Sequence, residues 1–369
     1  EQPRKGDIPI RLQDKIRKLP SSPGVYLMKD AIGHIIYVGK SKNLKNRVRS
    51  YFQNGKTRSR KLENLVKNAK DLDYIETDTE FEALLLENQL IKKLDPRYNK
   101  KLKNPRSYTY IAIRTGADRP GIRTAAAKKE NDGSLYFGPF PNRTTVEKAI
   151  RGLKEFLRID CTNPSSSGHP CLNYSLGLCF GICLGGEAAI RYRQILSQIA
   201  LLLSAKDAAI LKEMREKMKE AAARYDFETA ARYRDYWISV RSLIQKEQAI
   251  RFAEKRRNIA LLERLNEETC KLFLIKGNQI LSAERLRLDN RGRDGLKQRI
   301  KSRIVSVFGQ ADASPQEMHK ENVDEAEIIY QYLRKSGRPF LVVPKKWLQD
   351  HGGGKLDEGI DRLLATLRA

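Results

Sequence analysis

Gly24-Val25-Tyr26 and Tyr37-Val38-Gly39 are the two short stretches that decide the fold of the N-terminal part of the chain. Apolar and β-branched residues at 25–28 and 35–39 flank the turn-forming stretch Asp30-Ala31-Ile32-Gly33, so the sequence predicts a β-hairpin. Glycine lets other groups approach the backbone closely, and a phenol can donate or accept a hydrogen bond. A tyrosine and a glycine in each stretch therefore indicate a candidate reaction site on this hairpin.

A basic segment follows the hairpin. Residues 40–61 include nine Lys and Arg and neither Asp nor Glu. Ser41 or Asn43 is a suitable N-cap for a helix that we expect to run to about Tyr51. Lys and Arg form charge-assisted hydrogen bonds with phosphate oxygens. The segment is therefore a candidate phosphate-binding surface beside the hairpin.

An amphipathic helix is predicted over residues 79–93, after a helix over 62–69 and a strand over 72–77. Its apolar stripe consists of Phe81, Leu84, Leu85, Ile91 and Leu94. Glu87 lies near the middle of this helix, and Asp95-Pro96 is expected to end it. A lone glutamate on a helix is most often a solvated charge, so Glu87 carries little information by itself.

The composition bounds the class of protein. A chain of 369 residues suggests about two to four domains, and 40% hydrophobic with 31% charged residues fits soluble globular domains. The net charge of +26 favours a polyanionic partner, nucleic acid before an acidic membrane surface. No apolar stretch approaches the roughly 18 residues of a membrane span, and no signal peptide is recognisable, so we expect a cytoplasmic protein without a membrane partner. Because the chain begins with Glu1 and not Met, we expect residue 1 to be an internal boundary.

Four cysteines lie close together in the sequence: Cys161, Cys171, Cys179 and Cys183. Their spacing, C-x9-C-x7-C-x3-C, differs from the closely paired cysteines of common zinc sites. Four thiolates nevertheless suffice for zinc or for an iron–sulfur cluster. The alternative is a set of reduced, partly buried cysteines between helices. Cys270 stands apart on a predicted strand, where we expect it in a core.

A helical hairpin is predicted from Asp207–Tyr225 and Phe227–Ile244. Residues 205–245 hold nine basic and seven acidic residues, so this segment is nearly neutral, unlike the rest of the chain. Two helices alone bury little apolar surface, so the hairpin needs a partner surface or packs inside this chain. Beyond it, strands over 259–265 and 271–288, helices over 296–308 and 324–335, and a strand over 340–343 predict a C-terminal α/β domain. Its segment 285–303, with eight basic residues, is either a DNA contact or a solvated rim.

Three segments together resemble one family. The N-terminal module resembles a GIY-YIG nuclease, with Val in the middle of each triplet. This module, the stretch Pro170-Cys171-Leu172-Asn173-Tyr174 to Cys183, and the 207–244 hairpin are similar, in this order, to the UvrC family, the nuclease component of bacterial UvrABC excinucleases, where the hairpin is a UVR domain. The resemblance covers about residues 15–245 and weakens afterwards.

The resemblance implies an α/β multi-domain protein in four parts. Residues 15–105 would form a nuclease domain with a small mixed sheet flanked by helices, 106–200 a linker and cysteine-rich helical region, 205–245 the UVR hairpin, and 255–369 an α/β domain. The second, RNase H-like nuclease of the family is not recognisable after Pro344. We therefore expect either a piece of a longer protein or a shortened homologue.

The resemblance also implies roles for single residues. Tyr26 and Tyr37 correspond to the paired strand tyrosines, with Tyr37 as the expected general base. The remaining nuclease positions are Lys40 and Arg47 as phosphate ligands, Tyr51 in the proton network, Asn99 as a positioning group, and Glu87 as the single carboxylate ligand of Mg²⁺ or Mn²⁺. A single carboxylate disfavours a two-metal mechanism. For the cysteines the resemblance implies a [4Fe–4S] cluster, with zinc as the weaker alternative.

The implied function is a structure-directed endonuclease of nucleotide excision repair. It would cut damaged double-stranded DNA on the 3′ side of a lesion, near the nucleoid, after loading by the helicase subunit UvrB. The 207–244 hairpin would bind that helicase, with Tyr225, Phe227 and Ala230 as candidate contacts. Two other interpretations remain open: a non-catalytic DNA-binding adaptor that docks the helicase, and an RNA-processing or mobile-element nuclease, which fits only the first hundred residues.

Overall fold

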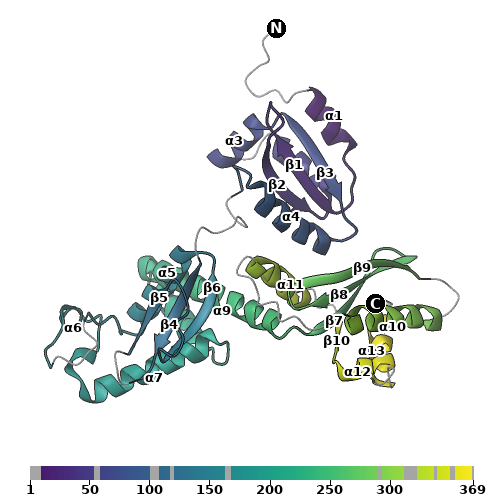
Figure 1. Cartoon of the computed structure of the whole chain (residues 1–369). Helices are drawn as coiled ribbons and strands as arrows, with labels where there is room; N and C mark the ends of the chain where they lie inside the picture. Colours follow the sequence, from purple (N-terminus) through teal and green to yellow (C-terminus); the bar gives the residue numbers. More distant parts are fainter. Residues whose placement is uncertain are drawn as a thin grey trace, which may run out of the picture. The chain divides into compact units, whose positions relative to one another are not determined.

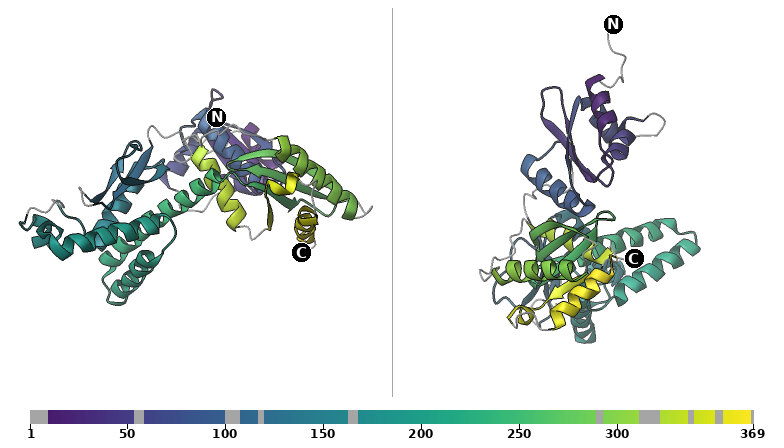
Figure 2. Two further views of the ribbon diagram at one scale, coloured as in Figure 1. Left: turned by 60° about the horizontal axis from the view of Figure 1, so that its bottom comes forward. Right: turned by 90° about the vertical axis from the view of Figure 1, so that its right-hand side faces the viewer.

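The computed structural model describes residues 10–53, 59–99, 108–116, 120–162, 168–288, 293–310, 322–335, 339–349 and 354–367. The chain divides into two compact units. One contains residues 1–104, 255–317 and 324–369, and the other contains residues 105–254 and 318–323. Figure 1 labels the elements, and Figure 2 gives two further views. The α/β multi-domain class predicted from the sequence is confirmed.

The predicted N-terminal hairpin is present as β1 (Gly24–Lys29) and β2 (Ile35–Ser41). A third strand, β3 (Asp71–Glu76), pairs with the other side of β1, which gives the order β2-β1-β3. Both pairings are antiparallel, so the expectation of a mixed sheet is wrong for the described strands. The helices between β2 and β3 carry the chain across β1, and β3 then enters running opposite to β1.

Helices cover both faces of this sheet: α1 (Ile10–Lys18), α2 (Leu44–Phe52), α3 (Arg60–Asn68) and α4 (Glu80–Leu94). One face, with Tyr26 and Met28, packs on apolar residues of α1, α2 and α3. The other face, with Val25, Leu27 and Val38, packs on α4. Leu94, which we expected in the apolar stripe of α4, is 37% exposed at the last position of the helix.

Helix termini in this domain agree with the capping signals in the sequence. The side chain of Asn43 accepts a hydrogen bond from the backbone N–H of Asn46 and caps α2. Thr79 and Glu82 form a reciprocal capping box at the start of α4. Such caps satisfy backbone N–H groups that have no partner inside the helix. They fix the entry of the two helices that carry the basic residues and Glu87.

The second unit begins with a separate antiparallel sheet of β4 (Thr109–Arg114), β5 (Gly121–Ala125) and β6 (Ser134–Phe140) in the order β5-β4-β6. Gly138, Pro139 and Pro141 in the sequence predict a loop at 137–141, but β6 continues to Phe140. Pro139 has no N–H for a ladder, which is why this strand end resembles a loop in the sequence. A Glu247 carboxylate oxygen accepts a hydrogen bond of 2.9 Å from the Gly138 N–H.

Helices follow this sheet: α5 (Arg143–Phe156), the short α6 (Leu172–Ser175), a 3₁₀ turn at Ile182–Leu184, and α7 (Gly186–Leu203). The predicted hairpin is present as α8 (Ala209–Ala223) and α9 (Phe227–Glu254). Helix α9 runs past the predicted end at Ile244, because residues 245–254 contain no helix breaker and bury Ala249, Ile250 and Ala253. The base of the hairpin packs inside this chain, since Ile210, Met214, Val240, Leu243 and Ile244 belong to the core of the second unit.

The C-terminal domain has a four-stranded antiparallel sheet of β7 (Asn258–Arg264), β8 (Thr269–Lys276), β9 (Gln279–Arg287) and β10 (Phe340–Val343), in the order β10-β7-β8-β9. Its helices are α10 (Arg293–Gln310), α11 (Val323–Lys335), α12 (Lys346–Gln349) and α13 (Gly354–Ala365). Cys270 is fully buried, as predicted. Helix α13 was not anticipated, and it completes the core around Leu356, Ile360 and Leu363.

None of the helices in the described ranges is both long enough and apolar enough to cross a lipid bilayer.

Candidate active site

Three tyrosines meet beside the N-terminal hairpin. Tyr26 of β1 and Tyr51 of α2 share a hydrogen bond of 2.7 Å between their hydroxyl oxygens. The centre of the Tyr37 ring, on β2, lies 6.1 Å from the centre of the Tyr26 ring and 6.3 Å from the centre of the Tyr51 ring. Burial, together with the neighbouring phenols, raises the pKa of Tyr26 and of Tyr37 above the ordinary value. The phenols of Tyr26 and Tyr37 are therefore neutral in the resting protein.

The glycines of both triplets are required by close contacts. In the register of the hairpin, Tyr26 lies opposite Gly39, and a Cβ on Gly39 would lie 2.3 Å from the Tyr26 hydroxyl oxygen. A Cβ on Gly24 would lie 2.4 Å from the carbonyl oxygen of Ile75 on β3. The absent side chain at Gly39 lets the Tyr26 ring cross β2 and reach Tyr51.

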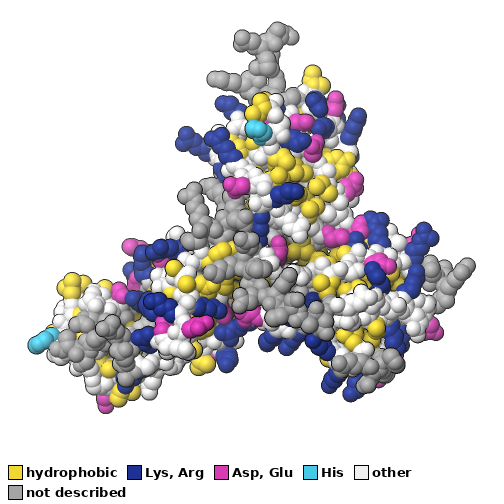
Figure 3. Space-filling view, in the orientation of Figure 1, with side chains coloured by type: hydrophobic (Ala, Val, Ile, Leu, Met, Phe, Trp, Pro, Cys, Tyr) yellow, Lys and Arg dark blue, Asp and Glu magenta, His cyan; other side chains and the backbone are white. Residues whose placement is uncertain are grey.

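Arg47 places a cation beside the phenols. Its guanidinium carbon lies 5.1 Å from the centre of the Tyr51 ring, a cation–π distance. Burial opposes the charge of Arg47, but the neighbouring phenols outweigh it and raise its pKa, so the guanidinium stays protonated. Figure 3 shows further Lys and Arg side chains gathered near α3, at the upper left of the N-terminal domain. Lys42 and Arg49 are among the exposed basic residues of this segment.

Glu87 lies at the edge of the sheet, where β2 is the outer strand. One of its carboxylate oxygens accepts a hydrogen bond of 3.1 Å from the backbone N–H of Lys40. Burial raises the pKa of Glu87, and the hydrogen bond from Lys40 with the charges of Lys40 and Arg47 offsets only part of that effect. The charge of Glu87 in turn contributes to the raised pKa of Tyr37. Glu87 therefore lies close enough to Tyr37 and Arg47 for their charges to interact.

Asn99 completes the outer edge of β2. Its side-chain oxygen accepts from the Val38 N–H at 3.0 Å, and its amide donates to the Val38 carbonyl at 2.9 Å. The Tyr98 N–H donates to the Ile36 carbonyl at 2.9 Å. Unpaired strand edges are otherwise open to solvent or to another chain. Asn99 thus holds the strand that carries Tyr37 and Lys40.

Glu80 is a residue near the site that the sequence reasoning missed. Its two carboxylate oxygens contact the ammonium groups of Lys40 at 2.5 Å and of Lys42 at 2.9 Å. The pair to Lys40 means that this lysine already has an anionic partner in the resting protein. The signal in the sequence was weak, because an acidic residue in the first turn of a helix is common for electrostatic reasons alone.

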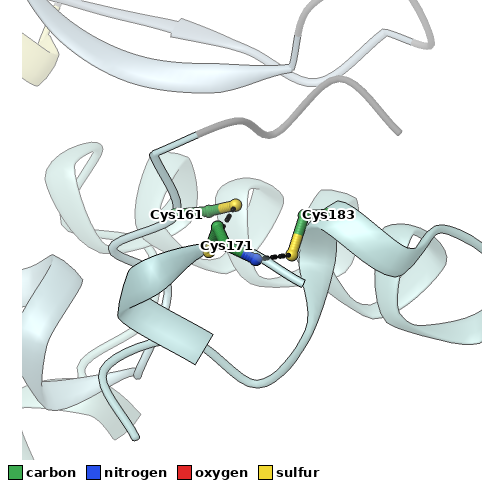
Figure 4. Close-up of side chains that lie close together, drawn as sticks. All are labelled: Cys161, Cys171 and Cys183. Carbon is green, nitrogen blue, oxygen red and sulfur yellow. Dashed lines mark hydrogen bonds between the residues drawn. The ribbon is translucent and has the colours of Figure 1, made fainter. Parts of the chain in front are cut away.

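Three of the four expected cysteines come together. The sulfur atoms of Cys161, Cys171 and Cys183 lie within 4.8 Å of one another, and in the described part of the chain no other Cys, His, Asp or Glu residues form such a group of three or more. Figure 4 shows the three thiols converging, with Cys161 and Cys171 sulfurs 3.8 Å apart. The prediction of four clustered cysteines is thus met for three. Cys179 is buried outside the group, where its sulfur accepts a hydrogen bond from Gly181.

The Cys171 thiol differs from an ordinary one. Burial raises its pKa, but hydrogen bonds from the backbone of Thr162 and Tyr174 and from the thiol of Cys183 outweigh burial and lower the pKa to about 6. The backbone N–H of Cys171 also donates to the Cys183 sulfur at 3.3 Å. Thiolates bind metal ions, so the group is chemically suited to a metal or cluster.

The tip of the helical hairpin exposes aromatic rings. Tyr225 is 81% exposed and Phe227 is 65% exposed. Their ring centres are 6.2 Å apart in an edge-to-face arrangement. Ala230, one turn further along α9, is partly buried. The predicted partner residues therefore fall into an exposed aromatic pair and a less accessible alanine.

Comparison with protein families matches three consecutive parts of the chain. Residues 22–100 match the UvrC-like GIY-YIG domain, residues 108–202 match the middle domain of UvrC/Cho excinucleases, and residues 208–242 match the UvrB/UvrC motif. The chain belongs to the UvrC family. The three matches fall on the three segments that carry the resemblance, in the same order.

Curated members of the UvrC family match most of the chain. UvrABC system protein C of Clostridium perfringens (strain 13 / Type A) is 34% identical over 343 residues, which are 90% of this chain and 55% of the relative. The protein of the same name from Acetivibrio thermocellus is 33% identical over 344 residues, 91% of this chain and 55% of the relative. The chain spans about half the length of these curated relatives.

Solved structures of a relative cover the N-terminal domain. The GIY-YIG N-terminal endonuclease domain of UvrC from Thermotoga maritima, described as bound to magnesium, is 39% identical and corresponds to 25% of this chain and 99% of that chain, with a TM-score of 0.23. A point mutant of the same domain, described as bound to the catalytic divalent cation, is 37% identical over 26% of this chain and 100% of that chain, with a TM-score of 0.24.

Proposed function

We propose that this chain is a metal-dependent endodeoxyribonuclease of the GIY-YIG type, which hydrolyses a phosphodiester in damaged double-stranded DNA on the 3′ side of the lesion. The observation that carries the proposal is that Tyr37 and Arg47 both lie beside the Tyr51 ring, while Glu87 accepts a hydrogen bond from the backbone of Lys40, three residues after Tyr37 on β2. Phosphodiester hydrolysis needs a proton acceptor, positive charge at the phosphate and a means to activate water. These three side chains match those needs.

The basic residues would bind the scissile phosphate. Arg47 keeps its charge beside the tyrosines, and its planar guanidinium can grip two phosphate oxygens at once. Lys40, whose backbone N–H donates to Glu87, has its ammonium held by Glu80 in the resting protein. A DNA phosphate would compete with Glu80 for this ammonium. Tyr51, which contacts both Tyr26 and the Arg47 guanidinium, would hydrogen-bond the phosphate or extend the proton network.

Glu87 fits a divalent cation such as Mg²⁺ or Mn²⁺. Its side chain is partly buried and its pKa is raised, which is the expected state of a charge that lacks full compensation. Mg²⁺ is commonly held by one or two carboxylates while it keeps several waters, so one carboxylate suffices. When bound, such a cation supplies positive charge and lowers the pKa of water.

Tyr37 is the proposed general base. In the resting site it keeps its proton, because burial and the neighbouring charges, that of Glu87 among them, raise its pKa. Compensation of the Glu87 charge would remove one of these contributions. Asn99 keeps the Tyr37 strand in place through both hydrogen bonds to Val38 and acts as a positioning residue.

The proposed partner of the hairpin is the helicase subunit UvrB. The exposed pair Tyr225 and Phe227, with Ala230 behind it, offers apolar surface at the tip, and the nearly neutral charge of residues 205–245 favours a protein partner over DNA. Tyr225→Ala with Phe227→Ala should weaken binding to the purified helicase by about 10-fold, since exposed aromatics are frequent interface anchors. Because the substrate is genomic DNA, we infer an association with the nucleoid.

The cysteine group is the proposed site of a [4Fe–4S] cluster, with zinc as the alternative. Cys161, Cys171 and Cys183 supply three thiolates, and Cys179 is the proposed fourth ligand. Anaerobically purified protein with absorbance near 400 nm and about four iron atoms per chain supports the cluster. One zinc atom per chain without absorbance near 400 nm would favour zinc over the cluster. Folded protein that contains neither iron nor zinc would contradict both proposals.

The nuclease and the adaptor functions are separated by one assay. Lesion-bearing duplex is incubated with the helicase and Mg²⁺ or Mn²⁺, together with the wild-type chain or Glu87→Ala. We expect cutting by the wild type and a loss of about 10³-fold in the variant, with DNA binding retained. Equal cutting by both would contradict the role of Glu87. No cutting by either, with DNA and helicase still bound, would favour a non-catalytic adaptor.

A further inference from the structure

Helix α4, which carries Glu87, is buried on two faces. Ala83 and Ile91 pack on the N-terminal sheet. Phe81 is also fully buried, but its ring stacks on Tyr332 of α11 at 4.3 Å and meets Phe273 of β8 edge-on at 5.3 Å. An amphipathic surface helix normally buries one apolar stripe. The second buried face of α4 is thus made by the C-terminal domain.

Ion pairs, of which those of Lys271 are largely buried, join the same two domains. Lys271 of β8, whose side chain is 9% exposed, places its ammonium 2.8 Å from a carboxylate oxygen of Glu82 and in contact with Asp78. Arg285 of β9 donates from Nε to Asp78 at 2.7 Å. Charges are costly to bury unless they are paired and hydrogen-bonded. A pair of this kind specifies one position for the start of α4.

The contacts continue along the helix. Asn88, the residue after Glu87, is fully buried, and its amide donates to a carboxylate oxygen of Glu325 on α11 at 3.4 Å. The Lys92 ammonium lies 3.9 Å from Asp324 and 4.0 Å from Glu325. The C-terminal domain therefore touches α4 on both sides of Glu87 in the sequence.

The first turn of α4 faces both domains at once. Glu80 holds Lys40 and Lys42 in the nuclease pocket. Its neighbours Asp78, Phe81 and Glu82 contact the C-terminal strands and α11. Any shift of this turn would move Glu80 and, along the same helix, Glu87.

We propose that β8, β9 and α11 form a positioning platform for the helix that carries Glu87, with Lys271 as its principal positioning residue. The platform holds the first turn of α4 so that Glu87 stays at the edge of β2 and Glu80 stays on Lys40. The consequence for catalysis rests on the proposed nuclease function. A misplacement of about 1 Å at a reacting centre can cost about 10²-fold in rate, so distant contacts of this kind matter to the chemistry.

The test compares three variants of the full chain: Lys271→Ala, Lys271→Arg and Lys297→Ala. Lys297 of α10 is the matched control, because it pairs with Asp361 in the same domain, and α10 packs on the other face of the sheet, with Leu272 and Leu274. Hydrogen exchange of peptides covering 80–94 should be about 10-fold faster in Lys271→Ala than in the wild type. Lys271→Arg and Lys297→Ala should retain the wild-type exchange.

Activity provides the second measurement. In the incision assay, Lys271→Ala should raise the half-saturating Mg²⁺ concentration several-fold and lower kcat, while DNA affinity stays within about 2-fold and Lys271→Arg restores both. Arg285→Ala, which removes a more exposed partner of Asp78, should act in the same direction with a smaller effect.

The proposed platform would be overturned if hydrogen exchange of α4 in Lys271→Ala is the same as in the wild type, or if Lys297→Ala accelerates it equally. Unchanged Mg²⁺ dependence alongside faster exchange would overturn its catalytic consequence. The exchange experiment needs no cutting. A wild type that fails to incise would therefore refute the proposed nuclease function, while the exchange of α4 would still decide the platform by itself.

Discussion

The candidate nuclease site and the cysteine-rich region both appear in the sequence as sets of chemically suggestive residues, yet they are organised differently. In the pocket, Tyr26, Tyr37 and Arg47 lie on regular elements whose register and caps determine where side chains point. In the cysteine-rich region, three thiols meet on short irregular segments while Cys179 forms an isolated bridge with Ile159. Regular secondary structure thus makes a site predictable, and irregular backbone leaves ligand membership open.

The largest effect is expected for Arg47→Ala, which tests whether the pocket acts through a phosphate contact. Incision should fall by about 10²–10³-fold, because the cation that stabilises developing charge on the phosphate is removed. DNA affinity should change little, since the other basic residues carry most of the binding to the DNA backbone. The slope of log affinity against log salt concentration should decrease by about one phosphate contact. Parallel incision and filter-binding measurements check both. A loss of binding as large as the loss of incision would show that Arg47 serves only as a DNA anchor.

Gly39→Ala tests the register that makes the pocket predictable. The new Cβ would lie 2.3 Å from the Tyr26 hydroxyl oxygen, so the Tyr26 ring or strand β2 must shift, which disturbs the hydrogen bond to Tyr51. We expect incision to fall by about 10²-fold and the free energy of unfolding to drop by about 1–3 kcal/mol, as for other overpacked sites. Gly116→Ala is the control, because among the described residues no atom beyond its chain neighbours lies within 4 Å of its Cβ position. If Gly39→Ala cuts DNA at the wild-type rate, the absence of a side chain at Gly39 is not required for the site.

Cys171→Ser and Cys179→Ser test which cysteines of the cysteine-rich region are ligands. Loss of a thiolate ligand should weaken metal or cluster retention by about 10–100-fold in both variants if Cys179 becomes the fourth ligand. Cys270→Ser is the control, because this buried thiol lies in the C-terminal core away from the group. Iron and zinc content after dialysis measures the effect. Full retention in Cys179→Ser would restrict the protein ligands to the three thiols that already converge.

The pH dependence of incision is the smallest expected effect. Burial raises the pKa of Glu87 above its ordinary value of 4.5, so the carboxylate proposed to hold the cation is protonated as the pH falls through that raised pKa. The acidic limb should therefore lie above pH 4.5 and move to lower pH as Mg²⁺ increases, because the cation binds only the carboxylate. Incision rates at several Mg²⁺ concentrations check this. An acidic limb that does not move with Mg²⁺ would assign it to another group.

Much of the nuclease domain was predictable from the sequence, and the physical reason is local. The hairpin, the Asn43 cap and the amphipathic helix of Glu87 follow from turn residues, capping residues and apolar spacing. Antiparallel pairing of β3 and the contacts of Phe81 with Tyr332 depend on residues far apart in the chain. Such contacts leave no periodic signal in a single sequence.

The same distinction explains the residues that were missed or misjudged. Glu80 resembled an ordinary acidic residue of a first helical turn, although it pairs with Lys40. Leu94 belonged to the apolar stripe by spacing, but it is the last residue of the helix and is partly exposed. Residues 137–140 contain Pro139 and so resembled a loop, whereas the strand continues through them. Tertiary context decided each of these cases.

The most direct test of the central claim compares two crystal structures of the full chain with Mn²⁺ and a short DNA duplex. One contains the wild type, with a non-hydrolysable phosphate linkage in the DNA, and the other contains Glu87→Gln with the same DNA. In the wild type we predict a single anomalous manganese peak at the Glu87 carboxylate, with one phosphate between Arg47 and Tyr37, and no peak there in the variant. Manganese away from Glu87, two adjacent ions, or a phosphate that contacts Arg47 but lies apart from Tyr37 would contradict the account.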